Sequence, residues 1–99
     1  MQTVRVAPME LDLQTAPAFV ADIRRTIDEA GEGPLTVDCE QITFMDSAGY
    51  YALLDVTRYA NASGHTLVIG SVPPLPSWVL QLCDRDHDLT IEPLTGASP

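Results

Sequence analysis

Basic residues are scarce in this chain of 99 residues. It has five lysines and arginines against 14 aspartates and glutamates, and its formal net charge is −9. The five basic residues are all arginines, and only Arg24 and Arg25 are adjacent. A chain of this charge with no basic cluster repels a phosphate backbone, so we expect no direct binding to nucleic acid. The acidity suits a basic protein partner, and solubility alone is the other explanation.

Long apolar runs are also absent. No window approaches eighteen apolar residues, and the N-terminus lacks a basic region followed by an apolar stretch. We therefore expect a cytoplasmic protein without a membrane segment. Apolar residues make up 45% of the chain, and its length suits one hydrophobic core. The expected organisation is one domain over residues 1–94 and a short flexible tail over residues 95–99.

Cysteine is limited to Cys39 and Cys83, which lie far apart and have no metal-ligand spacing. In a cytosolic protein, two reduced thiols are the default. A redox-sensitive pair formed by these two cysteines is the alternative.

The apolar periodicity predicts alternating strands and helices. Strands are expected at residues 3–7, 35–39, 66–70 and 89–91, and helices at 15–30, 47–62 and 77–83, the first capped by Thr15 and the last by Ser77. Residues 9–14 and 71–76 are expected to be connecting segments. This order, with right-handed crossovers, predicts an α/β fold: a mostly parallel four-stranded sheet with helices packed mainly on one side. The strand at 66–70 is the most continuously apolar and should be central.

The stretch from Thr43 to Gly49 lies where an apolar segment ends and a helix is expected to begin. Asp46 followed by Ser47 at such a junction offers either a helix cap or a hydroxyl for modification or attack. It partly matches the hydrolase motif G-x-S-x-G, but Met45 replaces the first glycine that relieves the strained turn. We therefore expect no enzyme activity.

The same region offers two other kinds of site. Glu10, Asp12 and Asp46 could hold a divalent ion if their loops meet, but acids in loops are usually solvated, so we expect no metal and no cofactor. A phosphate on Ser47 would be tolerated at a helix N-terminus and would act as a local charge switch. The alternative is a serine that merely caps the helix.

Four segments together resemble a known family: Glu10-Leu11-Asp12, Thr15-Ala16-Pro17, Phe44-Met45-Asp46-Ser47-Ala48-Gly49, and Gly64 before a strand. They are similar to the STAS domains of bacterial anti-sigma factor antagonists, and the resemblance extends from about Val4 to Ile91. It implies a small α/β domain without catalytic activity. The unphosphorylated antagonist of that family binds a kinase-type anti-sigma factor and thereby regulates transcription. The kinase then phosphorylates the serine, here Ser47, and a phosphatase reverses the step.

The resemblance also implies where partners bind. The expected contact residues are Asp12, Asp46, Ser47, Ala48, Gly49, Tyr50 and Tyr51. Ala48 leaves no second hydroxyl beside Ser47, and the tyrosines place a bulky ring where a partner would approach. Related STAS domains serve as accessory subunits or scaffolds in stress-sensing or lipid-transport complexes without a phosphorylation switch, which is the alternative function. An exposed edge strand is expected to leave the chain a monomer or a weak homodimer.

Overall fold

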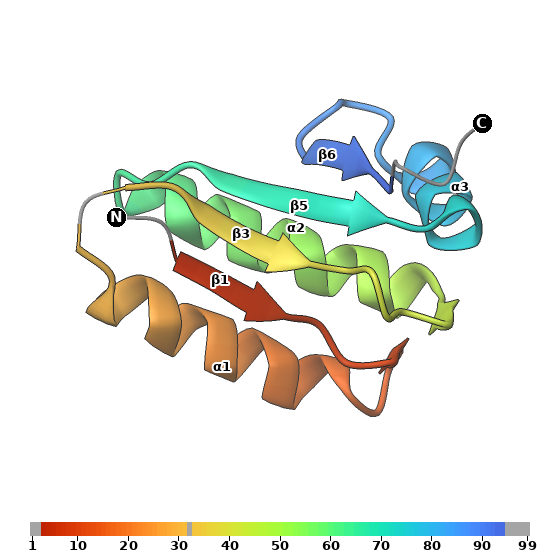
Figure 1. Ribbon diagram of the computed structural model, residues 1–99, viewed down its shortest axis with the longest axis horizontal. Helices are drawn as coiled ribbons and strands as arrows, with labels where there is room; N and C mark the ends of the chain where they lie inside the picture. The colour runs from red at the N-terminus through yellow and green to blue at the C-terminus, as the bar shows by residue number, and fades with distance from the viewer. Residues whose placement is uncertain (1–2, 32, 95–99) are drawn as a thin grey trace.

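Four short apolar segments pair into one sheet in the computed structural model, which describes residues 3–31 and 33–94. The strands are β1 (Thr3–Val6), β3 (Leu35–Asp38), β5 (Leu67–Val72) and β6 (Thr90–Pro93). Their order is β1-β3-β5-β6, and all three neighbouring pairs are parallel (Figure 1). The prediction that the strand at 66–70 is central is confirmed, because β5 lies between β3 and β6.

The register of the sheet explains its two unequal faces. Leu35 pairs with Leu67 and Val37 with Ile69, and all four side chains are buried. The residues between them point to the opposite face and are only half-buried, as Val68 shows. This alternation is typical of a sheet with one covered face. The predicted fold class, an α/β domain with helices mainly on one side of a parallel sheet, is confirmed.

Three helices connect the strands: α1 (Ala16–Glu29), α2 (Ser47–Ala62) and α3 (Pro74–Cys83). α1 buries Phe19, Ile23 and Ile27, which recur every four residues and so share one face. α1 and α2 pack against each other, and α3 lies at the end of the sheet where β5 finishes (Figure 1). The ends predicted for the first two helices are confirmed, and Gly64 after α2 has the left-handed φ of +84° expected there.

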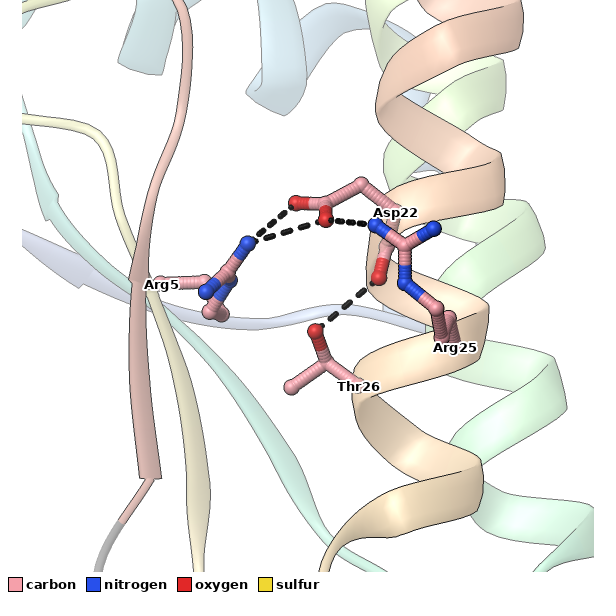
Figure 2. A network of polar contacts seen from close by, with 4 residues as sticks. All are labelled: Arg5, Asp22, Arg25 and Thr26. Atoms are coloured by element: carbon pink, nitrogen blue, oxygen red, sulfur yellow. Dashed lines mark hydrogen bonds and ion pairs between the residues drawn. The ribbon is translucent and has the colours of Figure 1, made fainter.

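An ion-pair network connects the edge strand β1 to α1, as Figure 2 shows. One nitrogen of the Arg5 guanidinium donates to both carboxylate oxygens of Asp22 at 2.9 Å, and Arg25 donates to the same carboxylate at 2.9 Å. The hydrogen bond from Arg5 is the main cause that lowers the pKa of Asp22. The groups are partly exposed, so the network orients the strand edge more than it stabilises the fold.

One predicted connecting segment contains a strand. β2 (Glu10–Leu11) and β4 (Phe44–Met45) form a second, two-stranded parallel ladder that pairs Glu10 with Phe44 and Leu11 with Met45. Strands of two residues are too short to show a period. Tertiary burial explains the ladder, since the side chains of Leu11 and Met45 both lie in the core.

The start predicted for the third helix is wrong. α3 begins at Pro74, and the first bond of its ladder runs from the Ser77 N–H to the Pro73 carbonyl at 2.8 Å. Pro74 and Pro76 fit in the first turn because N–H groups there have no partner within the helix. Ser77 is therefore a buried residue inside the helix and caps nothing. The tail expected over residues 95–99 lies outside the described residues.

Gly49 allows the first turn of α2 to pack directly on β2. A Cβ atom there would overlap the Leu11 carbonyl oxygen and lie 2.7 Å from Cγ of Met45. We expect Gly49→Ala to lower the free energy of unfolding by about 1–3 kcal/mol, because the backbone of Leu11 has to move. Gly31→Ala is the matched control, since no atom lies within 4 Å of its added Cβ. Urea denaturation checks this, and equal midpoints for the two variants would contradict it.

Candidate docking site around Ser47

The β2–β4 ladder places the first linker beside the start of α2. Leu11 pairs with Met45, and Asp12 and Asp46 are the residues that follow each of them. Ser47 comes next, as the first residue of α2. The structure therefore brings together Asp12, Asp46 and Ser47, which the sequence predicted to share a site.

Asp46 caps α2. Its backbone is extended, with φ −122° and ψ −168°, and its Oδ1 accepts hydrogen bonds from the N–H groups of Ala48 at 3.0 Å and Gly49 at 3.2 Å. The alternative that Ser47 merely caps the helix is therefore wrong. Ser47 is exposed, and its hydroxyl makes no hydrogen bond with any residue that the structure describes. The Asp46 carboxylate thus caps α2, and the Ser47 hydroxyl remains free to interact with a partner.

Asp12 shapes the loop that faces Ser47. Its Oδ1 accepts hydrogen bonds from the N–H groups of Gln14 and Thr15, both at 3.0 Å. The Thr15 hydroxyl donates to the carbonyl of Glu10 at 2.8 Å and accepts from the Asp12 N–H at 3.0 Å. Thr15 occupies the cap position of α1, but its side chain does not cap the helix, because these loop contacts use it.

A divalent ion finds no cluster of ligands here. Within residues 3–31 and 33–94, no group of three or more histidine, cysteine, aspartate or glutamate side chains is arranged to hold a metal. Glu10, Asp12 and Asp46 thus do not form the site considered from the sequence. The Oδ1 atoms of both aspartates are engaged by backbone N–H groups.

Two residues expected to contact a partner are buried, which corrects the sequence interpretation. Gly49 packs on Leu11, and Tyr50 points into the protein, where its hydroxyl donates to Asp84 at 3.2 Å. Burial, reinforced by this hydrogen bond, raises the pKa of Tyr50 to about 12. Both residues follow the helical period of α2, in which only every third or fourth position reaches the surface.

Asp84 is a buried carboxylate that the sequence did not single out. Besides the Tyr50 hydroxyl, it accepts hydrogen bonds from the N–H groups of Asp88 at 3.0 Å and Leu89 at 3.1 Å. It therefore fixes the turn after α3 and attaches it to α2. Its neighbours Asp86 and Asp88 are exposed, so composition alone could not distinguish it.

Beside Ser47, an open apolar groove runs between α1 and α2. It is lined by Leu13, Pro17 and Val20 on one side and by Ser47, Ala48 and Tyr51 on the other. We call it the α1–α2 groove. Leu13 is 77% exposed and Tyr51 is 64% exposed. The sequence predicted the α2 side of this groove and missed the α1 side, because the exposure of Leu13 cannot be read from the sequence.

Farther along the same face, polar contacts connect the two helices. Arg24 donates to Asp55 at 2.7 Å and lies over the ring of Tyr59 at 4.6 Å. The Tyr59 hydroxyl donates to Asp28 at 2.5 Å, and this bond is the main cause that raises the pKa of Tyr59. Tyr51, Asp55 and Tyr59 recur every four residues from Ser47, so one row of α2 faces the groove and these contacts.

Comparison with known proteins agrees with this arrangement. The family model described as "Mlab, STAS domain" matches residues 4–94. The chain belongs to the STAS domain family. The fold is also similar to part of a solved mouse anion transporter, Solute Carrier 26 family member A9, in the inward-facing state. That match has a TM-score of 0.79 at 12% sequence identity and covers 95% of this chain but 16% of the transporter chain. At this identity the likeness shows the fold alone.

No helix in the described part of this STAS domain is long and apolar enough to span a bilayer.

The two cysteines are free thiols in different surroundings. Cys39 is fully buried at the end of β3, and burial raises its pKa to about 12. Cys83 is half-buried in the last turn of α3. Their pairing under oxidation stays a prediction.

Unfolding experiments can distinguish the capping role of Asp46 from the free hydroxyl of Ser47. We expect Asp46→Ala to lower the free energy of unfolding by about 1 kcal/mol, because two N–H groups of α2 lose their acceptor. Asp46→Asn keeps an acceptor oxygen and should recover most of that loss. Ser47→Ala should stay within about 0.5 kcal/mol of the wild type. Thermal unfolding checks all three, and a loss for Ser47→Ala equal to that for Asp46→Ala would refute the assignment.

Thiol labelling can distinguish the reactivity of Cys39 from that of Cys83. At pH 8 we expect Ellman's reagent to modify Cys83 and to spare Cys39, whose pKa is raised to about 12, because the thiolate is the reacting species. Denaturant should release the second thiol. In Cys83→Ser no thiol should react before unfolding, whereas Cys39→Ala should keep the fast reaction. A fast thiol in folded Cys83→Ser, or a loss of two protons from the mass after mild oxidation, would show that Cys39 is accessible.

Proposed function

We propose that this STAS domain is an anti-sigma factor antagonist whose docking to a kinase-type anti-sigma factor is controlled by phosphorylation of Ser47. The observation that carries the proposal is the free, exposed hydroxyl of Ser47 at the edge of the α1–α2 groove. The domain itself has no catalytic role in this proposal. The anti-sigma kinase uses ATP to phosphorylate Ser47, and a phosphatase removes the phosphate.

The chemistry needs only an accessible acceptor. The Ser47 Oγ attacks the γ-phosphorus of ATP held by the kinase, the bond to the bridging oxygen breaks, ADP leaves, and the hydroxyl proton is released. Asp46 already takes the N–H groups of Ala48 and Gly49. A phosphate on Ser47 therefore finds those two donors engaged and extends outward, where a partner would lie.

The expected effect of the phosphate is to weaken docking. The groove beside Ser47 is mostly apolar, and a dianion is costly to bury against such a lining. The carboxylate of Asp46, which is adjacent to Ser47 in the chain, adds like-charge repulsion to the phosphate. The unphosphorylated chain is thus the form that binds the anti-sigma factor.

A second candidate is an accessory subunit or scaffold of a transport or stress-sensing complex, without a phosphorylation switch. It is favoured by the similar fold within the anion-transporter chain and by the description of the matching family model. In this case the α1–α2 groove would be a permanent contact surface, and Ser47 would be one of its polar residues.

Phosphorylation provides the test. Incubation with the cognate anti-sigma kinase and ATP should add one phosphate to the wild type by intact mass and none to Ser47→Ala. Thr43→Ala is the control, because Thr43 is another exposed hydroxyl nearby and its loss should leave the phosphate in place. Ser47→Asp should bind the anti-sigma factor roughly tenfold more weakly or worse. Absence of phosphate on the wild type, with Ser47→Asp binding its partner as the wild type does, would favour the accessory subunit.

A further inference from the structure

The side chain of Tyr51 borders two open depressions along α2. The first is the α1–α2 groove, which Tyr51 lines together with Ser47. The second is lined by Tyr51 with Arg24, Leu54, Asp55, Arg58 and Tyr59. Tyr51 is 64% exposed and follows Ser47 by four residues, so the two side chains stand one turn apart on the same side of the helix. A protein that covers Ser47 therefore also meets the Tyr51 ring.

A buried neighbour orients this exposed ring. The ring centroids of Tyr50 and Tyr51 are 5.1 Å apart and the ring planes meet at 66°, which is an edge-to-face contact. Tyr50 is itself fixed, because it is buried and its hydroxyl donates to Asp84 at 3.2 Å. The Tyr51 hydroxyl has no hydrogen bond to any residue within 3–31 and 33–94, so the ring contact is what orients it. A ring that is already ordered loses little conformational entropy when a partner covers it.

The charged side chains around the ring are paired within the chain. Those that line the two depressions are Arg24, Asp55 and Arg58. Arg24 pairs with Asp55 at 2.7 Å, and Arg58 pairs with Asp88 at 3.6 Å. A charge on a partner would compete with these pairs, whereas an apolar surface covers the ring without displacing either. Tyrosine is also among the residues that most often anchor a protein interface.

We propose that Tyr51 is the specificity-determining residue of the docking surface, and that its ring inserts into an apolar recess of the anti-sigma factor. This inference rests on the proposed function, which supplies the partner. A projecting ring fits a recess, but against a flat or charged surface it would hold the two proteins apart. Tyr51 thus selects among anti-sigma factors by shape, whereas the phosphate on Ser47 switches docking by charge.

Binding measured without ATP tests this role, because no phosphate is then added to Ser47. The purified chain is titrated with the cognate anti-sigma kinase by calorimetry. Tyr51→Ala should weaken binding about tenfold, and Tyr51→Phe, which keeps the ring, should recover most of the loss. Trp78→Ala is the matched control, because Trp78 is 61% exposed and lines neither depression, and it should bind as the wild type does. Melting temperatures should match, since both altered side chains are exposed.

Kinetics and a second kinase separate selection from a general loss of docking. With Tyr51→Ala as the substrate of the cognate kinase, KM should rise about tenfold while kcat stays at the wild-type value, because the Ser47 hydroxyl is unchanged. Against a non-cognate anti-sigma kinase, Tyr51→Ala should bind no more weakly than the wild type. An equal loss against both kinases, or a fall in kcat without a rise in KM, would contradict the proposed selection.

The binding results also distinguish this inference from the proposed function. If the wild type binds the kinase and Tyr51→Ala binds it equally well, the inference about Tyr51 is wrong and the proposed function stands. If the wild type does not bind the kinase, both are wrong. A dimer of the chain alone that Tyr51→Ala dissociates, measured by sedimentation, would assign the ring to a second copy and would also overturn the inference.

Discussion

The close contact between the first turn of α2 and the strand β2 sets the geometry of the site. Gly49 lies so near the Leu11 carbonyl that any side chain would displace one of the two backbones. This contact holds the β2–β4 ladder against the helix end, and the ladder places the loop of Asp12 beside Asp46. The exposed hydroxyl of Ser47 and the α1–α2 groove both follow from this placement, since the groove is bounded by that loop and that helix.

At the N-terminus of α2, the neighbouring side chains of Asp46 and Ser47 have different roles. Asp46 accepts the hydrogen bonds of the first N–H groups of α2, so the helix does not depend on the Ser47 side chain. A negative charge on Ser47 would therefore change the stability of the fold little. The polar side-chain atoms of Asp12 and Thr15 are engaged in hydrogen bonds within their own loop. The surface available to a partner is therefore narrower than the motif suggests: a hydroxyl, a small alanine, an exposed tyrosine and the apolar side of α1.

The sequence predicted the sheet and the first two helices, because these depend on local signals: alternation in strands, four-residue spacing in helices and the glycine at 64. It could not reveal β2 and β4, because a ladder of two residues exists only through the burial of Leu11 and Met45. It also misjudged the start of α3, where prolines read as a loop are compatible with a first helical turn. Asp84 was missed because only tertiary structure distinguishes it from the exposed acids beside it.

The hydrogen bond from Tyr50 to the buried Asp84 joins the beginning of α2 to the end of α3. It connects the first turn of α2, which carries Ser47, to the turn that follows α3. The distance between these two parts of the surface is therefore set by the core and not by a flexible linker.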